Sequence, residues 1–308
     1  MSLPMLTLFA IPKPFHGHIA VIQRNAIQSW KRMCLECEII LLGNDEGTAE
    51  VASELGLRHV PDIGTNQHGT PLVSDIFQTA QRLASNNILG YVNADIMLTS
   101  DFIQAVHQVA DASDKFLMVG QRWDVDIKTP WDFDTAGWDS RLQEFVKERG
   151  ALHSKAGMDY FVFPRGLYET VPPFAIGRTA WDNWLVAHAN KQSAYVIDAT
   201  ERVMAVHQDH DYGGLSKEAL WAGQEAKDNR KLMGSKYQTL DDVSHLLLSS
   251  GLRSIRTPKE LLRHPRRLLG KYPILRLPMR IAEAILEMSR PMRAALGLTR
   301  ASWKARRS

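Results

Sequence analysis

Two oxygen-bearing side chains, Asn93 and Asp95, stand two positions apart where an apolar run that begins at residue 88 breaks off. A continuous apolar run of this length is typical of a strand covered on both faces of a parallel sheet. Ligands of open α/β sheets bind beyond the carboxyl ends of such strands. Side-chain oxygens there can hold Mg²⁺ or Mn²⁺ against a diphosphate. The motif predicts a cation site for a nucleotide, with an ordinary strand-ending turn as the alternative.

A second group of ligand residue types follows a strand expected at residues 203–206. It reads His207-Gln208-Asp209-His210-Asp211-Tyr212-Gly213-Gly214. Imidazole and carboxylate groups both bind transition metals. This strand end is therefore the second place where we expect ligands, with a buried histidine bonded to a loop carbonyl as the alternative for His207.

Aromatic and acidic residues alternate in the middle of the chain. The tryptophans are Trp123, Trp131 and Trp138, and the acids are Asp124, Asp126, Asp132, Asp134 and Asp139. This pattern would suit a saccharide, because aromatic rings stack on sugar faces and carboxylates accept hydrogen bonds from sugar hydroxyl groups. A loop fixed to the core by its tryptophans is the alternative. Further on, Asp182 lies near the start of a helix expected at residues 179–189, where the helix dipole favours a carboxylate.

The elements that must position these residues alternate regularly in the first third of the chain. Strands are expected at residues 6–11, 38–42, 57–60 and 88–98. Between the first two, apolar residues recur every three or four positions over residues 19–30, as in a helix packed on a sheet. Four strand-helix units predict an α/β fold with a doubly wound, mostly parallel sheet.

Composition is ordinary for a globular protein, with 44% hydrophobic and 23% charged residues among 308. The first apolar stretch, residues 3–11, has no basic residue before it, which is atypical of a signal peptide. Two cysteines, Cys34 and Cys37, are too few for a zinc site of their own. We expect them to be reduced packing residues in a cytoplasmic protein.

Charge divides the chain. Residues 251–308 contain fifteen Lys and Arg against three Glu, a net +12, whereas the whole chain carries +3, so residues 1–250 carry −9. We therefore expect a domain over residues 1–245 and a basic, amphipathic helical tail over residues 246–308. Such helices suit an anionic membrane surface, although packing on the acidic body or an oligomer contact would use the same pattern. Nucleic-acid binding is not expected, since the charge lies on a tail that offers no aromatic platform for base stacking.

Taken together, these motifs resemble the GT-A type of glycosyltransferase, the nucleotide-diphospho-sugar transferase fold, over about residues 4–235. The segments that carry the resemblance are Ile11-Pro12-Lys13-Pro14-Phe15, Asn25-Ala26-Ile27-Gln28-Ser29-Trp30, Asn93-Ala94-Asp95, Trp181-Asp182-Asn183-Trp184 and Val206-His207-Gln208-Asp209-His210-Asp211-Tyr212. They are similar to a group of bacterial glycosyltransferase-like sequences that are mostly uncharacterised.

The resemblance implies a role for each matching position. Lys13 would lie near the nucleotide and Asp45 would contact its base. Asn93 and Asp95 would hold a Mn²⁺ or Mg²⁺ ion and the diphosphate, and His207 would complete the coordination, with His210 as the alternative. The family commonly has Asp where this chain has Asn93, so one negative charge fewer faces the cation.

The resemblance also implies the reaction. Asp182 would be the general base of an inverting transfer, with Asp159 as second choice. We therefore expect a cytoplasmic enzyme, which would be peripheral on the inner face of the membrane if its tail binds there. It would move a sugar from a nucleotide-diphosphate donor to a glycan or lipid-linked acceptor. The alternatives are a nucleotidyltransferase and a catalytically silent GT-A-like scaffold that binds a sugar, lipid or protein.

Overall fold

The computed structural model describes residues 6–210, 221–234 and 236–255. The expected ligand segment 211–214 and the tail beyond residue 255 lie outside the described residues. The described part belongs to one compact unit that ends at Ser254, and the main sheet continues past residue 245 to that point. The division into a catalytic domain and a basic tail stays a prediction.

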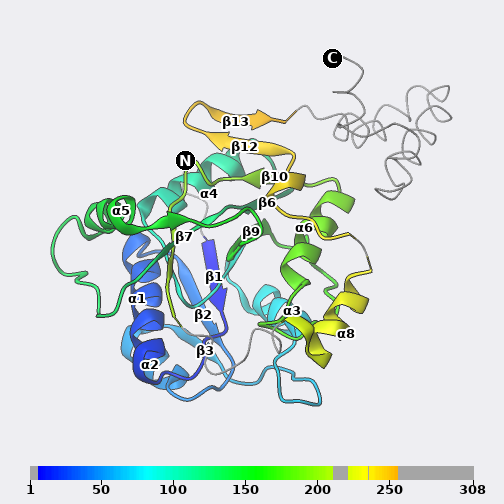
Figure 1. Ribbon diagram of the computed structural model, residues 1–308, viewed down its shortest axis with the longest axis horizontal. Helices are drawn as coiled ribbons and strands as arrows, with labels where there is room; N and C mark the ends of the chain where they lie inside the picture. The colour runs from blue at the N-terminus through cyan, green and yellow to red at the C-terminus, as the bar shows by residue number, and fades with distance from the viewer. Residues whose placement is uncertain (1–5, 211–220, 235, 256–308) are drawn as a thin grey trace, which may run out of the picture. The chain divides into compact units, whose positions relative to one another are not determined.

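A nine-stranded sheet forms the centre of this unit, with strand order β13-β12-β10-β6-β9-β4-β1-β2-β3 (Figure 1). Five of its eight pairings are parallel, so the predicted α/β fold with a mostly parallel sheet is confirmed. Its strands are β1 (Leu6–Ala10), β2 (Glu38–Leu42), β3 (Arg58–Val60), β4 (Ile88–Val92), β6 (Phe116–Val119), β9 (Tyr160–Pro164), β10 (Tyr195–Asp198), β12 (His245–Leu248) and β13 (Gly251–Ser254).

A smaller, four-stranded sheet has the order β5-β11-β7-β8. Its strands are β5 (Ile96–Met97), β7 (Arg122–Val125), β8 (Ala151–Leu152) and β11 (Ala205–Gln208). The helices are α1 (Gly17–Met33), α2 (Thr48–Leu55), α3 (Val73–Leu83), α4 (Ser100–Ala112), α5 (Trp138–Arg149), α6 (Trp181–Lys191) and α8 (Gln224–Met233), with a 3₁₀ turn η1 at Leu240–Asp242. Figure 1 shows α1 and α2 on one side of the main sheet and α3 and α6 on the other.

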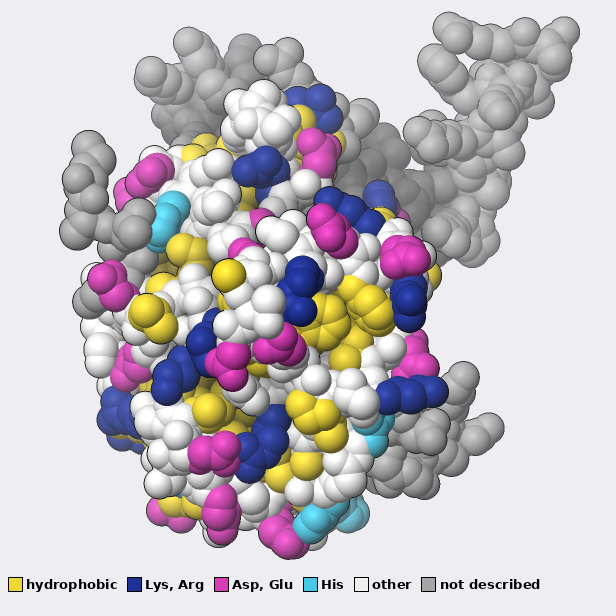
Figure 2. All heavy atoms as spheres, turned by 90° about the vertical axis from the view of Figure 1, so that its left-hand side faces the viewer, with side chains coloured by type: hydrophobic (Ala, Val, Ile, Leu, Met, Phe, Trp, Pro, Cys, Tyr) yellow, Lys and Arg dark blue, Asp and Glu magenta, His cyan; other side chains and the backbone are white. Residues whose placement is uncertain are grey.

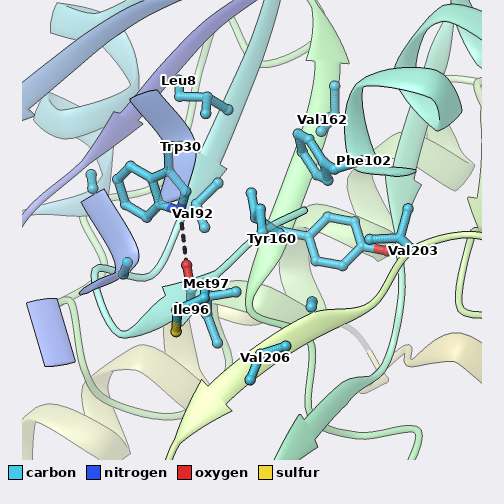
Figure 3. Packing of buried hydrophobic residues seen from close by; sticks show 14 of the residues in the cluster. Leu8, Trp30, Val92, Ile96, Met97, Phe102, Tyr160, Val162, Val203 and Val206 are labelled. Atoms are coloured by element: carbon cyan, nitrogen blue, oxygen red, sulfur yellow. Dashed lines mark hydrogen bonds between the residues drawn. The ribbon is translucent and has the colours of Figure 1, made fainter. Parts of the chain in front are cut away.

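The inner strands β1, β4 and β6 of the main sheet are buried on both faces, which explains why they are apolar without alternation. Alternate residues of β1, such as Leu6 and Leu8, pack into one core with Trp30 of α1 and Phe102 of α4 (Figure 3). On the opposite face Phe9 contacts the ring of Phe77 on α3, at a centroid distance of 5.3 Å. A parallel sheet covered by helices on both sides requires this composition.

Gly90 allows the close packing of β4 against its neighbour β1. A Cβ atom at this position would lie 2.8 Å from a methyl carbon of Leu8 and 3.5 Å from one of Val162. Glycine inside a strand commonly marks such a close approach. The strand that leads to Asn93 and Asp95 is thus fixed tightly between β1 and β9.

The sequence suggested a single strand at residues 88–98, but the apolar run divides into two strands. β4 ends at Val92, and a turn follows in which the Ile96 N–H donates to the Asn93 carbonyl at 3.1 Å. The chain then enters β5, which belongs to the smaller sheet. The indole N–H of Trp30 fixes this exit by donating to the Ile96 carbonyl at 2.8 Å (Figure 3). The motif therefore lies between the two sheets.

The expectation of reduced cysteines is wrong for this structure, because Cys34 and Cys37 form a disulfide. Cys34 ends α1, and the Cys37 N–H donates back to the Cys34 carbonyl at 3.3 Å. This turn brings the Cα atoms to 5.4 Å, within the usual range for a disulfide.

Two surface observations bear on partners. Among the described residues, no helix combines the length and the apolar character needed to cross a bilayer. On the face seen in Figure 2, acidic and basic side chains are interspersed. That face therefore offers no patch of a single charge sign.

Candidate active site

The turn after β4 joins Asn93 to Asp159, the residue just before β9. The Asn93 backbone N–H donates to the Asp159 carbonyl at 2.9 Å, and its side-chain amide donates to Asp159 Oδ1 at 2.6 Å. This pairing is possible because β4 and β9 are antiparallel, with Val92 opposite Tyr160. Asn93 therefore orients an acid, and its own Oδ1 atom points away from that contact.

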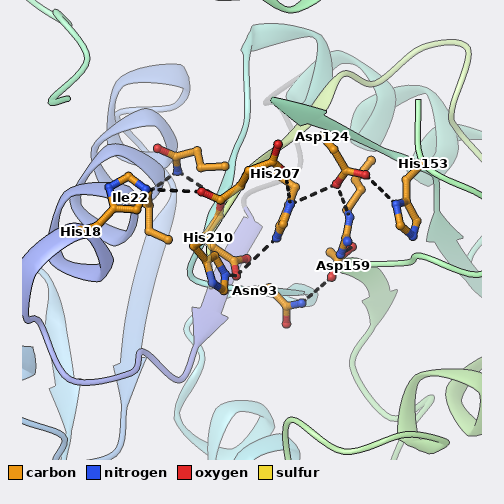
Figure 4. A network of polar contacts seen from close by, with 12 residues as sticks. His18, Ile22, Asn93, Asp124, His153, Asp159, His207 and His210 are labelled. Atoms are coloured by element: carbon orange, nitrogen blue, oxygen red, sulfur yellow. Dashed lines mark hydrogen bonds and ion pairs between the residues drawn. The ribbon is translucent and has the colours of Figure 1, made fainter. Parts of the chain in front are cut away.

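Asp95 meets two histidines from the end of β11. The His210 Nε2 atom lies 3.0 Å from Asp95 Oδ2, and the His207 Nε2 atom lies 3.9 Å from the same oxygen (Figure 4). Antiparallel pairing of β5 with β11 places His207 opposite Ile96 and so explains the approach. One ligand atom from each of the three residues lies within 4.8 Å of the others.

These three residues fit a divalent transition metal. Imidazole and carboxylate are both ligands of divalent first-row transition metals, and the carboxylate is the donor among them that suits Mn²⁺. The second carboxylate oxygen, Asp95 Oδ1, is buried and has no hydrogen-bond partner among the described residues. A buried polar atom without a partner is costly and calls for an explanation such as an ion. The donor set and the orphaned oxygen together make this a candidate cation site.

Electrostatics at Asp95 favour the charged form. Burial alone would raise its pKa, but the hydrogen bond from His210 and electrostatic interactions with His207 and Lys13 hold the pKa well below its usual range. An ionised carboxylate at neutral pH is what a metal ligand requires.

Asp124 of β7 lies on the other side of His207. Its Oδ1 atom is 3.0 Å from His207 Nδ1 and 2.9 Å from Arg122 Nε, and its Oδ2 atom is 2.6 Å from His153 Nδ1. Arg122 in turn donates to Asp159 Oδ2 at 2.9 Å. A chain of polar contacts thus runs from His153 through Asp124 and Arg122 to Asp159 (Figure 4).

Asp182 starts α6 and is partly buried. Burial raises its pKa to about 6; backbone N–H groups oppose this shift, while the negative charge of Asp159 adds to it. The neighbouring Trp181 packs edge-on against Tyr91 of β4, with ring centroids 5.3 Å apart. The start of α6 is therefore fixed beside the strand that leads to Asn93 and Asp95.

The backbone just before Asp182 has an unusual conformation. Ala180 has φ +89° although it is fully buried, and a non-glycine residue rarely adopts a positive φ. The side-chain amide of Asn229 on α8 donates to the carbonyls of Thr179, at 3.1 Å, and Ala175, at 3.0 Å. These contacts hold the loop that precedes Asp182. Strained residues of this kind cluster at functional sites.

The remaining predicted residues come from the loops after β1 and β2. The side-chain amide of Gln23 on α1 fixes the backbone of Lys13. Gln23 Oε1 accepts from the Lys13 N–H at 2.7 Å, and Gln23 Nε2 donates to the Lys13 carbonyl at 2.8 Å. The positive charge of Lys13 helps to lower the pKa of Asp95. Asp45 lies in the exposed turn after β2. In the described part of the chain, no hydrogen bond or ion pair links Asp45 to Asp95 or the two histidines.

The tryptophan and aspartate segment takes two different roles. Trp131 and Trp138 pack on Phe145 and Phe133, as in a loop fixed to the core. Asp132 bonds within its own turn. Asp124 alone of these acids faces His207. The sequence singled out Asp124 for sugar binding and did not single out Arg122 or His153. The spacing of two positions indicated only that Arg122 lies on the same face of a strand as Asp124.

This chain has matches among solved structures but none among family models or curated proteins. No family model matches the chain, and no curated protein matches it. Among solved structures, a mannosyltransferase of Pyrobaculum calidifontis in complex with GDP-Man and Mn²⁺ is similar with TM-score 0.49 and 16% identity, over 98% of this chain and 82% of that one.

Two further solved structures are similar to this chain. S. aureus TarS 1-349 in complex with UDP-GlcNAc has TM-score 0.47 and 8% identity, over 74% and 70% of the two chains. M. tuberculosis glucosyl-3-phosphoglycerate synthase has TM-score 0.45 and 14% identity, over 76% and 82%. With TM-scores below 0.5 these likenesses carry no argument, and the function proposed below rests on this chain's own residues.

Proposed function

We propose that this chain is a glycosyltransferase that uses a nucleotide-diphosphate sugar and a divalent cation, Mn²⁺ or Mg²⁺. The observation that carries the proposal is the cluster of Asp95, His207 and His210, with its orphaned carboxylate oxygen, between the two sheets. Asp159 connects this cluster electrostatically to Asp182, because its charge and that of Asp95 both act on Tyr91, and its charge also raises the pKa of Asp182. A cation site and an acid of raised pKa suit the transfer of a sugar from a diphosphate.

Asp95, His207 and His210 would hold the cation, and the free Oδ1 atom of Asn93 is a further oxygen for it. A bound divalent cation stabilises the negative charge that develops on a diphosphate leaving group. Lys13 adds a positive charge that acts on Asp95. The nucleotide would extend from there toward the loop of Asp45, whose carboxylate has no hydrogen-bond donor among the described residues and could accept from the base.

Asp182 would accept the proton of the acceptor hydroxyl. A pKa of about 6 leaves this carboxylate mostly ionised at neutral pH and more basic than an ordinary aspartate. Asp159 is the weaker candidate, because Asn93 and Arg122 already donate to its two oxygens. In the described part of the chain, no side-chain donor occupies Asp182. Attack by an activated hydroxyl from the face opposite the diphosphate would invert the anomeric centre.

The proposal extends to the acceptor and the location. A glycan or lipid-linked hydroxyl is the expected acceptor. The basic residues beyond 245 would attach a cytoplasmic enzyme peripherally to an anionic membrane, where each Lys or Arg near the surface contributes about 1 kcal/mol.

Release of nucleotide from a panel of UDP-, GDP-, dTDP- and CMP-sugars tests the proposal. We expect Mn²⁺-dependent release with one donor, inhibition by EDTA, and a loss of about 10²-fold or more in Asp182→Asn. Asp228→Asn, on the exposed face of α8 beside Lys231, is the matched control and should behave as wild type. Binding of a donor without release would favour the silent scaffold. Formation of pyrophosphate from a nucleoside triphosphate and a sugar phosphate would favour the nucleotidyltransferase.

A further inference from the structure

His207 has a carboxylate at each of its two ring nitrogens. Nε2 faces Asp95 Oδ2 at 3.9 Å, while Nδ1 faces Asp124 Oδ1 at 3.0 Å and Asp209 Oδ1 at 3.7 Å. The side chain is only 8% exposed, so its two ring nitrogens face these carboxylates and not solvent. A neutral imidazole has one N–H and one lone pair, and only the nitrogen with the lone pair can bind a metal. The group at Nδ1 therefore decides whether Nε2 is available.

Asp124 is the group that faces His207 Nδ1 at the shortest distance. It lies directly opposite His207 in the parallel pairing of β7 with β11. Arg122 Nε and His153 Nδ1 hold its two oxygens at 2.9 and 2.6 Å. A carboxylate fixed on a strand by a guanidinium and an imidazole keeps its position. It accepts a proton donor and repels a lone pair, so it selects the tautomer of His207 with hydrogen on Nδ1.

The contact between His207 Nδ1 and Asp124 is short, but its angle is not that of an aligned hydrogen bond. Such contacts in ligand-free sites commonly tighten when the ligand binds. A small rotation of the imidazole ring would align the Nδ1–H bond with Asp124.

A second cation bound between Asp124, His207 and Asp209 is the competing explanation, since these three also offer clustered ligand atoms. The contacts of Asp124 argue against it. Arg122 and His153 already contact both of its oxygens, and the guanidinium beside Oδ1 would repel a cation bound there. Arg122 is in addition tied to Asp159. Positioning of His207 is the role that keeps all these contacts intact.

We propose that Asp124 is a positioning residue that holds His207 with hydrogen on Nδ1 and so directs the Nε2 lone pair toward Asp95. This inference rests on the proposed cation site. Carboxylates that orient metal-binding histidines typically change metal affinity by about 10- to 100-fold. Asp124 itself would not touch the ion.

A double-mutant cycle on Mn²⁺ affinity, measured on the full chain by electron paramagnetic resonance, tests the proposal. We expect Asp124→Asn to bind Mn²⁺ about 10- to 100-fold more weakly than wild type. In a His207→Ala background the same substitution should have no further effect, because the residue on which it acts is gone. Asp228→Asn is again the control and should bind as wild type.

The outcomes separate the two claims. If wild type and Asp124→Asn bind equally, or if the two substitutions are additive, the positioning role is wrong while the cation site stands. If wild type binds no Mn²⁺, the cation site itself is wrong and the positioning role falls with it.

A second measurement needs no folded Asp124 variant. ¹⁵N-histidine NMR of the wild-type protein, with the His207 signals assigned by their loss in His207→Ala, reports which ring nitrogen carries hydrogen. We expect the Nδ1–H form at neutral pH. The Nε2–H form would overturn the proposal.

Discussion

The Nε2 atom of His210 lies 3.0 Å from Oδ2 of Asp95, although the two residues are 115 positions apart in the chain. His210 is almost completely buried, with 2% of its side chain exposed. Its hydrogen bond contributes more than any other interaction to the low pKa of Asp95. The pair therefore links the turn after β4 to the end of β11 and keeps the carboxylate ionised.

Replacement of His210 by Ala should weaken Mn²⁺ binding by about tenfold or more, since it removes a nitrogen ligand and the partner of Asp95. A Mn²⁺ titration followed by electron paramagnetic resonance would measure the change. His68→Ala is the matched control, because His68 is exposed in a loop and contacts Gln67. Equal affinity in His210→Ala and His68→Ala would remove His210 from the ligand set.

Asp182 should impose an acidic limb on the pH profile of kcat/KM. Its carboxylate can accept a proton only when ionised, and its pKa is about 6, so the rate should rise with pH through about 6 and then level off. Asp182→Asn should lose this limb together with about two to four orders of magnitude in rate. A profile of the wild type without an inflection near 6 would exclude Asp182 as the base.

The same pKa predicts a change in stability that does not depend on activity. The folded-state pKa of Asp182 lies above its ordinary value of 3.8. Its contribution to stability is therefore complete below about pH 4 and is lost as the pH rises through about 6. Asp182→Asn should raise the free energy of unfolding at pH 8 by about 1 to 3 kcal/mol, and by less at pH 4. Urea unfolding at the two pH values measures this, and an equal effect at both would contradict it.

Ala180 should tolerate glycine, unlike other buried alanines of the same region. Its φ of +89° is unfavourable for alanine and accessible to glycine, which offsets the lost methyl group. We expect Ala180→Gly to change the free energy of unfolding by less than about 0.5 kcal/mol or to raise it. Ala189→Gly, equally buried inside α6, should lower it by about 1 kcal/mol or more. Equal losses in urea unfolding would show that Ala180 is not strained.

Local pattern was sufficient to predict the first strands of the main sheet, but not β12 and β13, which form where the helical tail was expected to begin. The buried strands β1, β2 and β4 are short apolar runs between turn residues, and the helices between them have regular apolar spacing. These features depend on neighbours in the sequence. The break of the run 88–98 into β4 and β5 could not be predicted this way, because the second part pairs with a strand more than a hundred residues later.

The residues of the candidate site stand out in the sequence, but their pairings do not. Asp95, His207 and His210 are residue types that suggest ligands wherever they cluster. The contact of Asp124 with His207 follows instead from the register of β7 against β11, which no local pattern specifies. Asn93 shows the same limit, because its amide bonds Asp159 only through the antiparallel pairing of β4 with β9.

Thermal unfolding of the purified protein with UDP, GDP, CMP and dTDP, each with and without Mn²⁺, tests the central claim most directly. A ligand that binds only the folded state raises the midpoint by mass action. The account predicts a Mn²⁺-dependent rise with one nucleotide in wild type and in Asp228→Asn, and no rise in Asp95→Ala. A rise that is independent of Mn²⁺, or that persists in Asp95→Ala, would contradict the proposed cation site, and no rise with any nucleotide would contradict the proposed donor.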